Sequence, residues 1–247
     1  RNFIRMVAGG AAAHSDHGRS VAEVFMSAAR KETDIYKIKD DEKRKARAED
    51  FLGRHHTMGC PIRFIGVWDT VRALGVPFKV LEALNPFKNK FHNHRLCDNV
   101  KFGCHALSID DERRTFHPTL WNELEANENQ KIEQVWFAGV HTDIGGGYTE
   151  QGLADITLDW MVKKACSHGL RLYANHKITL SPDANGIMHD SRRGWARLYR
   201  KRQRTWTLQG VKPVIHRSVL ERTLDRHNEA SGYSPWILEH QPTTEPW

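Results

Sequence analysis

Residues 135–148 constrain this chain most, because an apolar segment runs directly into a polar, glycine-rich loop. The β-branched and aromatic residues at 135–140 form a run too short for a buried helix, so they predict a buried strand. His141 and Asp143 follow it, and three glycines come next. Ligands and catalytic groups gather at the carboxyl ends of strands in open α/β sheets. The pattern favours an active-site loop, and the alternative is a glycine-rich turn with Asp143 as a cap.

A second segment of the same design lies upstream. Residues 62–68 predict an apolar strand, and Asp69 follows it directly. A carboxylate after one strand and a histidine after a later strand is the order in which α/β hydrolases place the acid and base of a triad. The acid fixes the tautomer of the imidazole, which takes the proton of the nucleophile. Asp69 alone could equally cap a turn or helix, and the pairing with His141 favours the catalytic interpretation.

Three segments resemble the α/β-hydrolase domain of the type VI secretion phospholipase effectors, a bacterial family in which many relatives carry only the label of a domain of unknown function. They are Ile-Gly-Val-Trp-Asp-Thr-Val at 65–71, His-Ala-Leu-Ser-Ile-Asp-Asp-Glu-Arg-Arg-Thr-Phe-His-Pro-Thr-Leu-Trp at 105–121, and Trp-Phe-Ala-Gly-Val-His-Thr-Asp-Ile-Gly-Gly-Gly-Tyr at 136–148. The likeness covers roughly residues 60–195, in family order.

The resemblance implies an α/β fold, with a mostly parallel sheet flanked by helices and incomplete at its N-terminal side. It also implies a serine ester hydrolase of lipase or phospholipase type, with an acyl ester or phospholipid as substrate and no cofactor. Asp69 would be the triad acid and His141 the general base. The neighbouring loop residues are the candidate substrate contacts: Thr70, Gly145, Gly146, Gly147 and Tyr148.

The nucleophile of this family sits in a Gly-x-Ser-x-Gly elbow upstream of the acid, and the chain contains no such motif. The nearest approach is Gly-Arg-Ser-Val-Ala at 18–22, where Ser20 lacks the second glycine and a preceding strand. Residues 2–8 read like the helix that follows an elbow. We therefore expect the serine upstream of residue 1, and little turnover from these residues alone, because the nucleophile and the oxyanion donors supply the largest catalytic effects.

A second assignment of the triad stays open. Residues 186–191 contain His189 in a polar segment. In the commonest α/β-hydrolase layout the acid follows the penultimate strand and the histidine follows the last one. On that layout Asp143 would be the acid and His189 the base. Asp143 lies beside the base in either scheme.

The run from Arg192 to Arg204 accounts for much of the formal net charge of +7. Basic side chains interleaved with aromatic ones suit an anionic membrane surface. The candidate contacts are Arg192, Arg193, Trp195, Arg197 and Arg200. Nucleic acid is a disfavoured rival, since no nucleic-acid-binding motif surrounds the run, and a plain solvated helix is a further alternative. The competing function is a non-catalytic hydrolase-fold module that binds membranes or nucleic acid through this region.

Length and composition predict one domain over residues 1–247, with a core at about 60–195 and a basic C-terminal extension at 196–247. Residues 153–166 predict an amphipathic helix, and residues 77–104 an irregular connection that could act as a lid. The four cysteines lack metal-site spacing, so no metal is expected. No signal peptide and no apolar run of about 20 residues occurs, which favours a soluble protein, cytoplasmic or exported by a secretion system.

Overall fold

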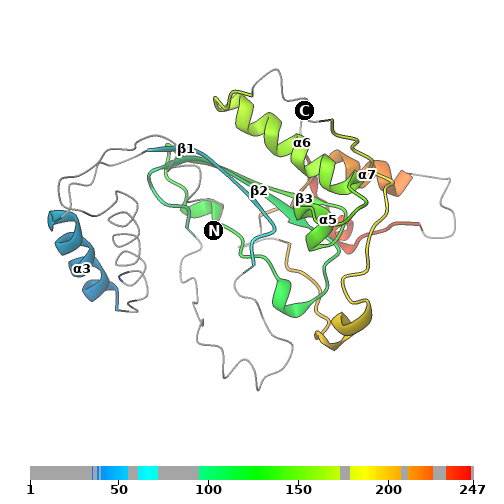
Figure 1. Ribbon diagram of the computed structural model, residues 1–247, viewed down its shortest axis with the longest axis horizontal. Coiled ribbons are helices and arrows are strands. Elements are labelled where there is room, and N and C mark those ends of the chain that lie inside the picture. Colours follow the sequence, from blue (N-terminus) through cyan, green and yellow to red (C-terminus); the bar gives the residue numbers. More distant parts are fainter. Residues whose placement is uncertain are drawn as a thin grey trace, which may run out of the picture. The chain divides into compact units, whose positions relative to one another are not determined.

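The computed structural model describes residues 35, 38, 40–54, 61–71, 95–172, 179–206, 211–224 and 232–245 (Figure 1). The chain divides into two compact units, residues 1–59 and 60–247. In the first unit, helix α3 (Asp41–Arg54) is strongly charged. The carboxylate of Asp40 accepts a hydrogen bond from the backbone N–H of Lys43 at 3.0 Å, which is the geometry of an N-cap.

The second unit is built on a parallel sheet of five strands in the order β1-β2-β3-β4-β5. The strands are β1 (Ile62–Trp68), β2 (Val100–Ser108), β3 (Lys131–Phe137), β4 (Val214–Ile215) and β5 (Thr243–Thr244). The helices of this unit are α5 (His141–Gly145), α6 (Gly152–Ser167) and α7 (Arg217–Leu224), and the 3₁₀ segments are η1 (Arg114–Phe116), η2 (Glu123–Glu125), η3 (Gly194–Leu198) and η5 (Trp236–His240). The predicted α/β class with a mostly parallel sheet is confirmed.

Both faces of β2 are buried from Gly103 onward, and both faces of β3 are buried over its last three residues, where its apolar run lies. Successive side chains point to opposite faces. On β3, Val135 and Phe137 join a cluster with Ile156 and Trp160 of α6, whereas Trp136 joins a second cluster with Trp206. Figure 1 shows α6 running along the sheet and α5 directly beyond the end of β3.

The structure confirms one local prediction from the sequence and contradicts part of another. The helix predicted at 153–166 is confirmed, since α6 differs by one residue at each end. The irregular connection predicted at 77–104 is wrong over its last residues, because β2 begins at Val100. Gly103 interrupts the apolar pattern there, yet it is a tight packing position: an added Cβ would lie 2.8 Å from Leu96 Cδ2. Residues 77–94 of the candidate lid, and Ser20, lie outside the described residues.

The segment predicted as a C-terminal extension, 196–247, contributes β4, α7 and β5 to the sheet and its surroundings. Within the described ranges, no helix combines the length and the apolar character needed to cross a bilayer.

Candidate active site

The acid loop begins where β1 ends. Asp69 is fully buried and has a φ of 36°, a left-handed conformation that aspartate tolerates better than most residues. Its backbone N–H donates to the carbonyl of Ala106 at 2.7 Å. The N–H of Thr70 donates to Nε2 of His105 at 3.1 Å. Burial lowers the pKa of His105 to about 4, so this ring is neutral and can accept the bond. The loop is therefore held by β2 on both sides of the carboxylate.

The base loop begins where β3 ends. Gly139 has a φ of 124°, and an added Cβ would lie 2.7 Å from the Cβ of Asp143, so only glycine fits. Three consecutive backbone N–H groups of this loop donate to three carboxylates. Gly139 donates to Asp110 Oδ2 at 2.6 Å, Val140 to Asp143 Oδ2 at 2.9 Å and His141 to Asp111 Oδ2 at 3.2 Å.

These two loops bring Asp69 and His141 together. Oδ2 of Asp69 lies 2.7 Å from Nδ1 of His141, which is the contact expected from the sequence. The His141 side chain is 31% exposed, and the edge of the Phe116 ring lies against it with 5.5 Å between centroids. Its other nitrogen, Nε2, has no hydrogen-bond partner in the part of the chain that the structure describes. The imidazole thus has one nitrogen bound to a carboxylate and one available.

Sequence reasoning did not single out Arg204, which belongs to the same cluster. Its Nη1 lies 2.5 Å from Asp69 Oδ1 and its Nη2 lies 3.0 Å from Asp69 Oδ2. The backbone N–H of Ser108 donates to Oδ1 as well, at 3.0 Å. Burial acts to raise the pKa of Asp69, but the charge of Arg204 and the hydrogen bonds from His141, Arg204 and Ser108 outweigh it and hold that pKa well below its usual range. Asp69 is therefore ionised throughout the neutral range.

The structure also brings the second predicted pair together. Nδ1 of His189 lies 2.7 Å from Oδ1 of Asp143. Oδ2 of Asp143 accepts from the backbone of His189 at 3.1 Å in addition to the bond from Val140. The far nitrogen of His189 lies 3.4 Å from Oε2 of Glu150, and Tyr148 stacks on the ring with 3.6 Å between centroids. Both nitrogens of His189 thus face carboxylates, and one ring face is covered.

The candidate substrate contacts occupy different positions. Thr70 is exposed directly after the acid. Gly145, Gly146 and Gly147 are exposed at the end of α5, and the last two have φ values of 79° and 128° that favour glycine. Tyr148 packs on His189. Asp69, His141 and Thr70 therefore lie at the carboxyl end of the sheet, while Tyr148 packs against the second pair.

The described thiols offer no alternative nucleophile at this site. Cys97 and Cys166 are exposed elsewhere, and Cys104 is buried within β2. Burial and the nearby charge of Glu133 raise the pKa of Cys104 to about 12, so its thiol stays protonated at neutral pH. Among the described residues, no three or more His, Cys, Asp or Glu side chains converge as a metal site would require.

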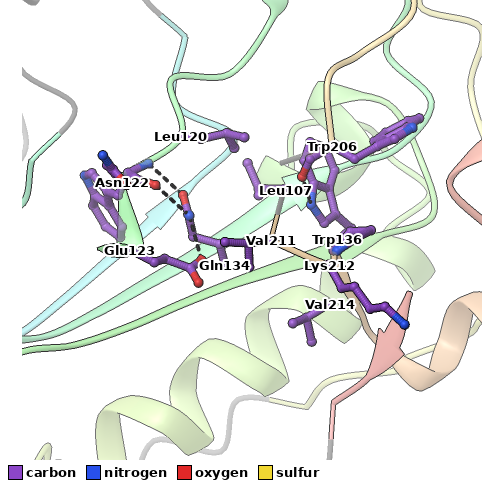
Figure 2. Close-up of a pocket in the computed structure, with 12 residues that line it drawn as sticks. Leu107, Leu120, Asn122, Glu123, Gln134, Trp136, Trp206, Val211, Lys212 and Val214 are labelled. Carbon is purple, nitrogen blue, oxygen red and sulfur yellow. Dashed lines mark hydrogen bonds between the residues drawn. The ribbon is translucent and has the colours of Figure 1, made fainter. Parts of the chain in front are cut away.

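None of three cavities lined by described residues includes His141 in its lining. The largest, of about 440 Å³, lies between α6 and α7, and another of about 360 Å³ lies beside Trp206 and Trp236. Figure 2 shows the smallest, of about 30 Å³, between Leu107, Gln134 and Trp206. That volume holds about two water molecules, so it is a packing gap rather than an acyl-chain site.

A family model for the catalytic domain of Tle1-like phospholipase effectors of the type VI secretion system matches residues 2–164. The chain belongs to this family. Asp69, His141 and Asp143 lie within the match, whereas His189 and Arg204 lie beyond it. A stretch of 49 residues is also 47% identical to carbon monoxide dehydrogenase 1 of Carboxydothermus hydrogenoformans, covering 20% of this chain and 8% of that protein. That stretch is too short to indicate a shared activity. No solved structure matches the chain.

Proposed function

We propose that this chain is a serine ester hydrolase domain that acts on phospholipids, with Asp69 as the triad acid and His141 as the general base. The observation that carries the proposal is the 2.7 Å contact between Asp69 Oδ2 and His141 Nδ1, which leaves Nε2 without a partner among the described residues. An acid–base pair with this one open nitrogen is what a hydroxyl nucleophile requires. Membership of a phospholipase effector family supports a lipid ester as substrate.

The proposed chemistry follows from these atoms. Nδ1–H donates to Asp69, so Nε2 is the basic nitrogen and takes the proton as the serine oxygen attacks the ester carbonyl. The imidazolium then gives this proton to the departing alcohol as the acyl–oxygen bond breaks. Water, activated by the same nitrogen, releases the fatty acid from the acyl-enzyme. Asp69 keeps its charge throughout and stabilises the imidazolium.

We expect the serine in sequence upstream of residue 1, because no Gly-x-Ser-x-Gly motif occurs in these residues. The open edge of β1 supports this placement. Among the described strands β1 pairs only with β2, and most of its side chains are only partly buried. A further parallel strand paired along the open side of β1 would end at the carboxyl end of the sheet. The loop after that strand would then lie near Asp69 and His141.

The geometry favours Asp69 with His141 over Asp143 with His189. A general base needs a free nitrogen within reach of the hydroxyl, and Nε2 of His189 faces the Glu150 carboxylate instead. The second oxygen of Asp143, Oδ2, also accepts hydrogen bonds from the backbone N–H groups of Val140 and His189. We propose that the pair of Asp143 and His189 holds the base loop in position.

The basic segment supports a membrane as the surface on which the substrate is met. Trp195 is 89% exposed and Leu198 is 48% exposed on η3. Arg193, Arg197 and Arg200 are exposed beside them, and none of the three forms an ion pair with a described residue. Interfacial tryptophan and unpaired arginines are attracted to anionic lipid headgroups.

This surface adjoins the base. The backbone N–H of Arg114 donates to the carbonyl of Arg200 at 2.9 Å. The Phe116 ring touches Tyr199 on one side and His141 on the other, with centroid distances of 5.6 and 5.5 Å. A lipid bound at the basic segment would therefore lie close to the imidazole.

The test is hydrolysis of a short-chain ester and of phospholipid vesicles by the protein extended upstream. Asp69→Ala and His141→Ala should each lower kcat by about 10⁴-fold. His189→Ala distinguishes the two pairs, since it removes the other imidazole and, acting only through the position of the loop, should lower kcat far less than His141→Ala. An inert wild type would reject the esterase and favour the binding module, while selective loss in His189→Ala would reject the assignment of the base.

A further inference from the structure

Every N–H of the Arg204 guanidinium has an acceptor. Nε donates to the carbonyl of Asp111 at 2.8 Å. Nη1 donates to Asp69 Oδ1 at 2.5 Å and to the carbonyl of Ser108 at 2.9 Å. Nη2 donates to Asp69 Oδ2 at 3.0 Å and to the carbonyl of Phe116 at 2.9 Å. Because a guanidinium has five donors in a rigid plane, these bonds leave it a single orientation.

That orientation determines how Asp69 presents its oxygens. The guanidinium grips both carboxylate oxygens side by side, and the Ser108 N–H adds a second bond to Oδ1. Oδ2 is the oxygen left with room for a further donor, and that donor is Nδ1 of His141 at 2.7 Å. A carboxylate held by this fork cannot rotate away from the imidazole, whereas one held by the backbone alone could.

The segment that carries Arg204 is itself firmly anchored. The carbonyl of Trp206 accepts a bond from Nε1 of Trp136 at 3.1 Å, and the two indoles meet edge to face with 5.0 Å between centroids (Figure 2). The backbone N–H of Arg202 donates to the carbonyl of Glu112 at 2.8 Å. Arg204 is thus positioned by β3 on one side and by the residues before η1 on the other.

We propose that Arg204 is a positioning residue of the reaction: it aims the Asp69 carboxylate at His141 and shares its negative charge. This role rests on the proposed esterase function. The chain's C-terminal part, beyond the family match, then completes the acid–base pair. A serine triad usually lends the full charge of its acid to the imidazole. Here a buried cation pairs with both oxygens of the acid, so Arg204 should reduce the share of the negative charge of Asp69 that acts on His141.

The charges around His141 come from several elements. Asp69 and Arg204 lie on the Nδ1 side. Asp111 accepts from the His141 backbone, and its carboxylate is paired with Arg113 at 2.6 Å. His105 lies behind the acid loop and is neutral. Asp143 accepts from Val140 of the same loop and pairs with His189. Because Asp111 is paired with Arg113, removal of Arg204 leaves Asp69 as the unpaired carboxylate in direct contact with the imidazole.

The first test uses the chain of 247 residues and needs no catalysis. Carbon-13 NMR of the Asp69 carboxyl should show it ionised down to the lowest pH at which wild type is folded. In Arg204→Met the same signal should titrate at a higher pH, and Arg204→Lys should fall between the two. Arg222→Met is the matched control, since Arg222 donates to the carbonyls of Ala184 and Gly186 and has no bond to Asp69. An Asp69 titration identical in wild type and Arg204→Met would overturn the proposal.

The second test guards against a folding defect. If Arg204→Met is poorly folded because it leaves a buried carboxylate unpaired, Asp69→Asn with Arg204→Met should recover resistance to urea. No recovery, with Arg204→Lys behaving as wild type in the NMR titration, would show a packing role alone and overturn the proposal.

The third test measures catalysis in the upstream-extended protein. Arg204→Met should lower kcat by about 100-fold with little change in KM, as expected for a misaligned catalytic group. The acid limb of its pH–rate profile should move to higher pH, and Arg204→Lys should restore part of the rate. An unmoved profile would refute the charge-sharing role. An inert wild type would count against the esterase, and the NMR titration would still report on the Asp69–Arg204 pairing.

Discussion

Asp110 should make the folded chain less stable as the pH rises from 4 to 7. Its Oδ2 accepts bonds from the Gly139 N–H at 2.6 Å and from the Tyr233 hydroxyl at 2.9 Å. Burial raises the pKa of Asp110 from 3.8 to about 6, although these hydrogen bonds and the charges of Arg222 and Arg204 oppose the rise. The folded state therefore holds a proton that the unfolded chain has lost at pH 5 to 6. Its stability is complete below pH 4 and falls as the pH rises towards 6.

The pKa difference sets the size of the effect. A rise from 3.8 to about 6 corresponds to about 3 kcal/mol at 1.36 kcal/mol for each pH unit. This value is an upper bound, because Asp110 keeps some contact with solvent. Asp110→Asn keeps a carbonyl oxygen for the same two donors and cannot ionise. The variant should match wild type at pH 4 and exceed it by up to about 3 kcal/mol at pH 8.

Urea unfolding of wild type and Asp110→Asn at pH 4, 5, 6, 7 and 8 measures this directly. The difference in unfolding free energy should open between pH 4 and 6 and then stay constant. Two stability curves that run parallel over the whole range would refute the assignment of the proton to Asp110. A difference that opens only above pH 7 would point to another titrating group.

Two other variants test the base loop and the basic surface. Gly139→Ala should destabilise the chain by about 2 kcal/mol or more, because its positive φ and the contact with Asp143 both exclude a Cβ; urea unfolding checks this against Gly145→Ala, where an added Cβ meets no atom within 4 Å. Trp195→Ala combined with Arg197→Glu should weaken binding to phosphatidylserine vesicles at least tenfold, as measured by co-sedimentation. Leu124 is exposed on η2, and Leu124→Ala should bind these vesicles as wild type does. Equal binding by both would argue against a membrane role for η3.

The sequence indicated the parts of the fold that have a strong local pattern. The apolar runs of β1 and β3 and the helical spacing in α6 were sufficient, because the end of β3 and one side of α6 are buried and most of β1 is partly buried. β4 and β5 have two residues each, too few for any periodicity. Their place in the sheet depends on long-range pairing, such as Trp136 with Ile215, which no local pattern encodes.

The site shows the same division. Asp69 and His141 could be found because each follows a strand, and strand ends meet at one edge of a parallel sheet. Arg204 was hidden in a run of basic residues that looks solvated as a whole. Its burial alternates with that of its neighbours: Arg204 and Trp206 are buried, whereas Gln203 and Thr205 are exposed. The local sign of this alternation was Trp206, an aromatic residue two positions after Arg204 at the end of the basic run.

Hydrogen bonds fix the backbone of the base loop without any bound substrate. Its three amides at Gly139, Val140 and His141 are each bound by a different carboxylate, and the hydroxyl of Ser108 donates to the Gly139 carbonyl at 2.7 Å. A loop with this many fixed backbone groups cannot tilt the imidazole without breaking buried hydrogen bonds. Such clustering of negative charge would be unfavourable alone. Arg113 and Arg204 offset it, so the arginines and the carboxylates together preorganise the base, which lowers the reorganisation needed at the moment of proton transfer.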